Sequence, residues 1–255
     1  MTNCCAGCPT RVTGICAPWR TEELNPIPAI RGPARMLSAR AELYRQGESC
    51  AHYFVLQSGW IALRVMLEAG SWHIADFALP GMLLGMQPVS GRAMSHSAIC
   101  LTDVVVCPLP RTQLDALAAT HAALGLQLAR ITACREERVQ DAFVNVSGRA
   151  ARERLAHLLV TVFYRIRRRL PERVGETVIF PVSLAQMGEA VNLTEVHVSR
   201  TLGILRDQGI VHFIRHKLEI LNPAALLRAA GFEGEALPIE DKSAAAAGNA
   251  ARVAV

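Results

Sequence analysis

Short apolar runs alternate with turn signals between about residues 36 and 110. The runs read HYFVLQ, WIALRVML, HIADFAL, AICL and DVVVCPL, and the turns that separate them read QGES, QSG, EAGS, LPG and VSGR. Short strands at such regular spacing are typical of antiparallel sandwiches and barrels. The pattern therefore predicts an antiparallel β-domain in the first half of the chain.

The pattern changes to a helical period after Arg111. No proline interrupts residues 111–146, where the apolar residues spaced in steps typical of a helix are Leu117, Leu124, Leu128 and Ile131. This spacing predicts one long amphipathic helix. The NVSG stretch at 145–148 is a credible hinge, and a second helix over about 149–169 is expected to end before Pro171.

The stretch VSLAQMGEAVNLTEVHVSRTLGILRDQG has the signals of two helices joined by a tight turn. Ser183 is a suitable N-cap with Gln186 as its capping-box partner, and Thr194 caps the next helix after an Asn-Leu turn. Gly209 is a natural C′ residue for that second helix. We expect a helix-turn-helix unit, followed by two short strands around RHK that form a wing.

The first turns of the second helix carry the residues expected to enter the DNA major groove. These are Thr194 at the cap and then Glu195, Val196, His197, Ser199 and Arg200. Arg200 is suited to a bidentate pair with guanine, and Ser199 to a phosphate or a base edge. The alternative is an ordinary helical hairpin with solvated polar faces.

Composition limits the other classes of function. Half of the 255 residues are apolar, which favours a globular chain. The sequence contains no run of about 18 uncharged apolar residues, so no membrane helix is predicted. No basic region precedes an apolar run at the N-terminus, so no secretion signal is predicted either. We therefore expect a cytoplasmic protein without a membrane partner. The net charge is +5, and the basic residues are unevenly distributed along the chain. The stretch RIRRRLPER at 165–173 holds five arginines, which form either a solvated helix end or a DNA contact.

Cysteines are crowded near the N-terminus, in CCAGCPTRVTGIC at residues 4–16. In a reducing compartment such a cluster favours a metal or redox role over stable disulfides. Thiolates are soft ligands that suit iron–sulfur clusters or zinc, and Gly7 and Gly14 allow tight turns around such a centre. A thiol enzyme would need a partner histidine, and no suitable histidine motif lies near these cysteines, so we expect no enzymatic activity.

The order of these parts resembles the CRP/FNR superfamily of bacterial transcription regulators over nearly all of residues 20–232. The stretches that carry the resemblance are LYRQGE (43–48), YFVLQSGWIAL (53–63), FALPGMLLGM (77–86), ARERLAHLL (151–159) and LTEVHVSRTLGILRDQGIV (193–211). The resemblance implies homodimers that bind near-palindromic double-stranded DNA, and RNA polymerase as a further partner.

The sequence patterns and the resemblance together predict an α+β fold with five parts. They are a cysteine-rich segment (1–30), an antiparallel β-roll of the jelly-roll, cyclic-nucleotide-binding-like type (31–110), a dimerisation helix (111–146), a winged helix-turn-helix domain (149–232) and a disordered tail (233–255).

Cyclic nucleotide is not the expected ligand. Binders of cyclic nucleotides carry an acidic residue and an arginine–serine pair in the phosphate cassette, which corresponds here to GMLLGMQPVSGRAMSHSA at 81–98. Met82 replaces the acidic residue and SHS replaces the pair, so the usual partners of the ribose and the phosphate are missing.

The oxygen-sensing FNR branch holds a [4Fe–4S] cluster, and the resemblance to it implies the ligands Cys5, Cys8, Cys16 and Cys107. Their C-x2-C-x7-C spacing is longer than in the best-known member. Cys4 is the alternative first ligand, and Cys100 is the substitute for the internal one. Other readings are a four-cysteine zinc site, a Cys4–Cys8 redox pair, and a haem, nitric oxide or small-effector sensor, for which the candidate haem ligands are His52, His73 and His96.

The apolar stripe of the long helix is the expected dimer seam, and it continues at the same spacing into Arg135 and Arg138. Charged residues at a seam weaken pairing, unless these arginines turn outward and pair with neighbouring acidic residues. We therefore expect a marginal dimer whose assembly depends on the cluster. Val196 stands where the FNR branch usually has a glutamate, so the half-site should keep the guanine read by Arg200 while its neighbours differ.

Overall fold

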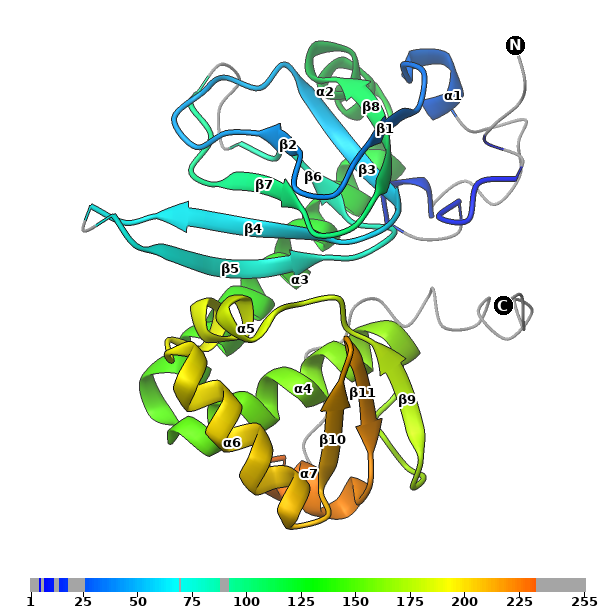
Figure 1. The fold of residues 1–255 in the computed structure, drawn as a ribbon. Coiled ribbons are helices and arrows are strands. Elements are labelled where there is room, and N and C mark those ends of the chain that lie inside the picture. Colours follow the sequence, from blue (N-terminus) through cyan, green and yellow to red (C-terminus); the bar gives the residue numbers. More distant parts are fainter. Residues whose placement is uncertain are drawn as a thin grey trace. The chain divides into compact units, whose positions relative to one another are not determined.

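A computed structural model of the protein describes residues 5, 7–11, 14–17, 26–68, 70–87 and 92–232. Within this part the chain forms two compact units (Figure 1). The first contains the described residues up to Met66 and those from Phe77 to Glu137, and the second contains Leu67–Asp76 and the residues from Arg138 onward. No helix in the described part of the chain is long and apolar enough to cross a membrane.

Two four-stranded sheets form the N-terminal half, in the orders β1-β8-β3-β6 and β2-β7-β4-β5. The strands are β1 (Arg35–Leu37), β2 (Glu42–Tyr44), β3 (His52–Ser58), β4 (Ile61–Met66), β5 (Trp72–Ala78), β6 (Leu83–Leu84), β7 (Ser97–Cys100) and β8 (Val104–Pro110). β3 pairs antiparallel with β8, and β4 pairs antiparallel with β7. The antiparallel fold predicted from the strand pattern is confirmed.

Strand β8 is buried on both of its faces. Val104 and Val106 contribute to the cluster that also contains residues of β2, β4 and β7. Cys107 and Leu109 point the other way, into a second cluster. Side chains alternate between the faces of a strand, so the continuous apolar run VVVCPL supplies two cores at once.

Helices and the cysteine segment cover the second cluster. It takes in Leu114 of α2 (Arg111–Thr120) and Leu124 of α3 (Ala122–Gly148), both fully buried. Ile15 of the short 3-10 helix η1 (Gly14–Cys16) and Ile27 of α1 (Ile27–Ile30) complete it. The sheet that carries Cys107 is therefore enclosed by parts of the chain that precede and follow it in the sequence.

The predicted single helix over 111–146 is wrong at His121, which has an extended backbone conformation (φ −119°, ψ 95°) between α2 and α3. The hydroxyl of Thr120 donates a hydrogen bond to the carbonyl of Leu117, as does the backbone N–H of His121. Thr120 and His121 thus both bond the carbonyl of Leu117 near the end of α2, and a new helix begins at Ala122.

The expected hinge at 145–148 is also displaced. α3 remains helical through Gly148, and Ala150 is the first extended residue before α4 (Ala151–Arg167). The side chain of Glu153 accepts a hydrogen bond from the backbone N–H of Ala150 at 3.1 Å and so caps α4.

The C-terminal part of the second unit is a small α+β domain. After α4 come β9 (Glu176–Ile179), α5 (Leu184–Val191), α6 (Glu195–Asp207), β10 (Val211–Ile214), β11 (Lys217–Ile220) and α7 (Pro223–Ala229). The three strands form one sheet in the order β10-β11-β9. Its core includes Leu159 and Phe163 of α4 and Val198 of α6, all fully buried.

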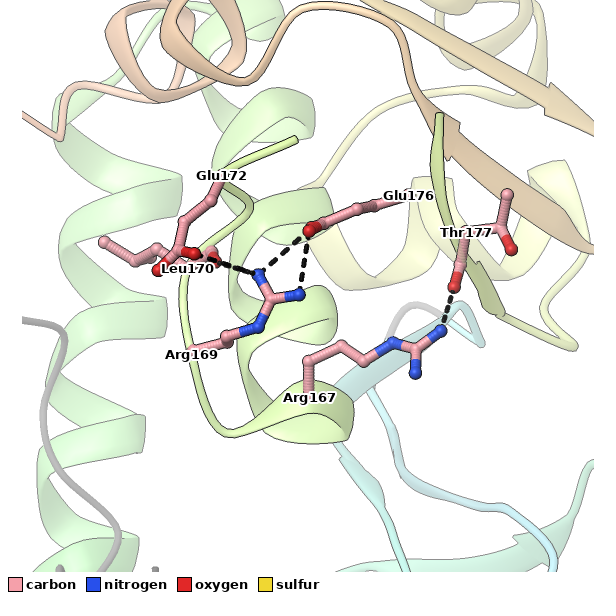
Figure 2. A network of polar contacts seen from close by, with 6 residues as sticks. All are labelled: Arg167, Arg169, Leu170, Glu172, Glu176 and Thr177. Atoms are coloured by element: carbon pink, nitrogen blue, oxygen red, sulfur yellow. Dashed lines mark hydrogen bonds and ion pairs between the residues drawn. The ribbon is translucent and has the colours of Figure 1, made fainter. Parts of the chain in front are cut away.

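The basic run at 165–173 is largely paired within the chain. Figure 2 shows the Arg169 guanidinium beside Glu176, at 2.7 Å in one hydrogen bond and 3.2 Å in another. Arg167 donates to the carbonyl of Thr177 at 2.6 Å. These contacts tie the end of α4 to β9, so both arginines serve the fold of the domain.

Candidate nucleic-acid interface and metal centre

Side-chain caps begin both helices of the predicted helix-turn-helix. The Ser183 hydroxyl accepts from the N–H of Gln186 at 3.2 Å, and the Gln186 side chain accepts from the N–H of Ser183 at 2.8 Å. Thr194 accepts from the N–H of His197 at 3.3 Å. The capping pattern read from the sequence is confirmed at both positions.

The turn between α5 and α6 is unusually close. A Cβ atom on Gly188 would lie 2.3 Å from the carbonyl oxygen of Leu193, so α5 approaches the turn more tightly than a side chain permits. Asn192 takes the left-handed conformation (φ 53°) that reverses the chain. Arg154 of α4 donates to the carbonyls of Val191 and Asn192 at 3.0 and 3.3 Å.

Gly188 and Arg154 are positioning residues that the sequence analysis missed. A glycine inside a helical pattern was the available signal for the first. No local signal marks Arg154, because its partners are carbonyls 37 and 38 residues away.

The predicted DNA-contacting residues all lie on the solvent-exposed side of α6 and its cap. They are Thr194, Glu195, Val196, His197, Ser199 and Arg200. Val198 and Leu205 are fully buried on the opposite side, and the hydroxyl of Thr201 donates to the carbonyl of His197. The inner face thus fixes the helix on the domain, and the first turns of its outer face are open to a groove.

The wing is a β10–β11 hairpin with a two-residue turn. Arg215 and His216 both have positive φ (48° and 63°), the geometry of a type I′ turn. Arg215, His216 and the following Lys217 are exposed. Their charge suits phosphate contacts beside the helix, a role that the sequence analysis did not assign to them.

The candidate metal centre lies on the outer face of the sheet β1-β8-β3-β6. Cys107 faces Val55 in the register of β8 and β3. Ile15 is fully buried in the same cluster, and Cys16 packs against it. The segment predicted to supply three ligands therefore lies against the strand predicted to supply the fourth.

The pKa of Cys16 depends on all three of the other predicted ligands. Burial raises the pKa of the Cys16 thiol to about 12, and Cys8, Cys107 and Cys5 add to this in that order, while Arg11 opposes them. Each neighbouring thiolate would repel a charge on Cys16, so the other three sulfurs all lie within electrostatic range of Cys16, and we call these four cysteines the thiol group. Across the described residues, no three His, Cys, Asp or Glu side chains are arranged to hold a metal ion.

Cys8 is held by polar contacts on both sides. Gln57 of β3 donates to its sulfur at 3.6 Å, and the Thr10 hydroxyl lies 3.3 Å away. The N–H of Cys8 donates to the carbonyl of Cys5, which closes a turn between these two cysteines. None of the seven described cysteines forms a disulfide, and Cys4 lies outside the described residues.

Gly14 fixes the segment just before Cys16. It has a positive φ of 57°, and a Cβ atom there would lie 2.1 Å from the carbonyl oxygen of Gly81. Its own carbonyl accepts a hydrogen bond from the Gln127 side chain at 2.8 Å. The glycine expected to allow a tight turn is thus enclosed between a loop of the β-roll and α3.

The other cysteines lie elsewhere. Cys100, the predicted substitute ligand, faces Ile61 in the second sheet and belongs to the cluster between the sheets. Cys50 packs against that same cluster, and Cys134 lies on α3.

The three histidines considered as haem ligands are not brought together. His96 is buried and hydrogen-bonded to the hydroxyl of Tyr44 at 2.9 Å, within the stretch compared with a phosphate cassette. His52 lies in β3 beside Phe54. His73 belongs to the other compact unit.

The apolar stripe predicted as the dimer seam faces the chain's own core. Leu124 is completely buried, so its assignment to a seam is wrong, and Leu117, Leu128 and Ile131 pack against the same cluster. Arg138 pairs with Asp76 at 3.3 Å, and Arg135 is half-buried. The helical periodicity correctly indicated an apolar face, but this face covers the β-roll of the same chain and not a partner helix.

Two domain families match the chain. The description "Crp-like helix-turn-helix domain" matches residues 153–229, and "Cyclic nucleotide-binding domain" matches residues 34–121. The first match contains the whole of α5, α6 and the wing, and the second contains both sheets.

Whole-chain relatives are regulatory proteins. The "Fumarate and nitrate reduction regulatory protein" of Vibrio cholerae is 26% identical over 228 residues, which cover 88% of this chain and 90% of that protein. The protein of the same name from Escherichia coli K12 is 25% identical, with 86% and 88% covered.

Solved structures share the fold. FixK2 from Bradyrhizobium japonicum aligns with a TM-score of 0.68 at 24% identity, over 77% of this chain and 96% of that one. A CRP-family transcriptional regulator from Thermus thermophilus aligns with a TM-score of 0.65 at 26% identity, over 80% and 98%.

Replacing Gly188 with alanine should destabilise the helix-turn-helix by about 1–3 kcal/mol, because the new methyl group meets a backbone carbonyl. The matched control is Gly203→Ala in α6, where nothing lies within 4 Å of the new Cβ. That change should stabilise the domain by roughly 0.5–1 kcal/mol. Urea unfolding followed by circular dichroism measures both, and an equal effect of the two substitutions would contradict the close approach.

Proposed function

Because the chain belongs to the CRP/FNR superfamily of transcription regulators, we propose that its DNA binding is controlled by an oxygen-labile [4Fe–4S] cluster on Cys5, Cys8, Cys16 and Cys107. The observation that carries the proposal is the docking of the cysteine segment beside Cys107: Ile15 is buried in the cluster that contains Cys107, and Cys16 packs against that cluster. The names of the relatives, which refer to fumarate and nitrate reduction, point toward regulation in the absence of oxygen.

The four thiols fit such a cluster chemically. Soft thiolates are its usual ligands, and when bound it supplies a redox-active centre that is sensitive to oxygen. Without a cation, burial and mutual repulsion keep Cys16 protonated, in keeping with its raised pKa. Positive iron would favour the thiolate at the position where the protein alone disfavours it.

The chain's own residues hold the cysteine segment at the sheet. Ile15 fills a place in the core beside Cys107, and Gln57 contacts Cys8 from β3. Ligation of three segment thiols and Cys107 to one centre would add covalent ties to this packing. Loss of the centre would leave only the packing of a short segment, so the segment's docking would respond to oxygen.

DNA recognition is assigned to α6 and the wing. The exposed Arg200 would pair with a guanine in the major groove, and Ser199 would contact a phosphate or base edge. Two such units related by a two-fold axis would read half-sites of a near-palindrome about one helical turn apart.

The exposed face of α3 is the proposed dimer seam. Its residues recur at steps of three and four along the helix, and they are Leu126, Ala129, Ala133, Glu136, Gln140 and Phe143. Leu126 is 55% exposed and Phe143 is 71% exposed. The alanines allow two helices to approach closely, and Glu136 weakens the pairing, which suits a dimer of marginal stability.

Cys16→Ser and Cys107→Ser should each lower the iron content of anaerobically purified protein from about four atoms per chain to below about one. Cys50→Ser, outside the thiol group, is the matched control and should retain iron. Elemental analysis and the visible spectrum test this. One zinc per chain, or a Soret band in place of cluster absorption, would contradict the proposed cofactor.

Arg200→Ala should weaken binding to the specific operator by roughly 5- to 150-fold, which corresponds to about 1–3 kcal/mol. Arg206→Ala is the matched control, because Arg206 lies near the other end of α6 and pairs with Asp207. Fluorescence anisotropy with operator and scrambled DNA measures both. If the two substitutions lowered specific affinity equally, α6 would not read bases through its first turns.

Leu126→Glu should raise the dimer dissociation constant at least about tenfold, equivalent to about 1.4 kcal/mol, because it places a charge in an apolar seam. Ala116→Glu adds the same charge at an exposed position of α2, outside the proposed seam, and should change little. Sedimentation equilibrium of anaerobic protein measures both. An unchanged dimer in Leu126→Glu would place the seam elsewhere.

A further inference from the structure

Gln127 interrupts the apolar face that α3 turns toward the β-roll. On the same face, Leu124 belongs to the cluster that contains Cys107, and Leu128 and Ile131 pack against that cluster. Gln127 itself is only 5% exposed. A buried primary amide among apolar side chains loses its water and needs a protein partner.

That partner belongs to the cysteine segment. The Gln127 Nε2 donates to the carbonyl of Gly14 at 2.8 Å, across 113 positions of the chain. Gly14 is held from its other side by the Gly81 loop, which leaves no room for a Cβ. The next two residues are the buried Ile15 and the predicted ligand Cys16. The hydrogen bond thus joins α3 to the segment within two residues of the thiol group.

The bond makes the position of α3 depend on the segment. With the segment docked, the amide is satisfied and Ile15 fills the adjoining space. With the segment displaced, the same amide would face an apolar cluster that has lost both its acceptor and Ile15. Either water enters the cluster or α3 shifts, and both events alter the packing of the helix that carries the exposed Leu126.

We propose that Gln127 is the positioning residue through which docking of the cysteine segment is transmitted to α3. The inference rests on the proposed cluster and names the contact that couples it to dimer assembly. Leu124 packs against the β-roll in either state, whereas the Gln127 bond forms only when the segment is docked.

The test compares Gln127→Met with Gln113→Met. Methionine keeps the length and approximate volume of glutamine and removes its donor, so packing is retained. Gln113 is an exposed glutamine of the preceding helix α2, outside the proposed seam, and serves as the matched control. For each protein, the dimer dissociation constant is measured by anaerobic sedimentation before and after air exposure, and iron per chain and the melting temperature are measured in parallel.

The expected result separates a loss of coupling between the segment and α3 from a loss of the cluster itself. Wild type and Gln113→Met should show the same ratio of the two dissociation constants, whereas Gln127→Met should keep its iron and bring that ratio to within about twofold of unity. An unchanged ratio in iron-loaded Gln127→Met would overturn the role of Gln127 while leaving the cluster proposal intact. A wild type without iron, or with a ratio of one, would overturn the cluster proposal and this inference together.

Discussion

The proposed control of assembly and DNA binding depends most on the docking of one short segment against the outer face of a sheet. Ile15 enters the cluster formed by Val55, Cys107 and Leu109, and the conformation of Gly14 permits the approach. The sheet can offer this face because β8 is apolar on both sides. Burial of Ile15 is therefore what brings the thiols of a chain terminus within electrostatic range of an internal cysteine.

Helix α3 covers this face of the sheet with one side and leaves its other side exposed. Its inner side covers the β-roll through Leu124 and touches the segment through Gln127, while its outer side carries exposed apolar residues such as Leu126. A change at the inner side therefore acts on the same rigid element that is proposed to pair two chains. The DNA-reading domain depends on different contacts, chiefly the caps of α5 and α6 and the Arg154 bonds to the turn.

Local patterns predicted much of this arrangement. Alternating apolar runs identified the sheets, and Ser183, Gln186 and Thr194 identified the starts of α5 and α6 because caps bond within a few residues. The thiol group followed from a resemblance and not from spacing alone. The predicted dimer seam was wrong at Leu124, because helical periodicity indicates an apolar face but not which part of the protein covers it. Arg154 and Gln127 were missed because their roles depend on carbonyls that are distant in the sequence. Gly188 was missed because a glycine in a helical pattern does not itself reveal that the nearby Leu193 carbonyl excludes a Cβ atom.

The most direct measurement follows wild-type protein through stepwise exposure to air, with cluster absorption and operator anisotropy recorded on the same sample. The account predicts that the absorption and the specific affinity for DNA fall together, and that the bound fraction tracks the remaining cluster. Affinity that stays constant while the absorption bleaches, or anaerobic protein that binds its operator with no cluster absorption at all, would contradict the claim that the thiol group controls DNA binding.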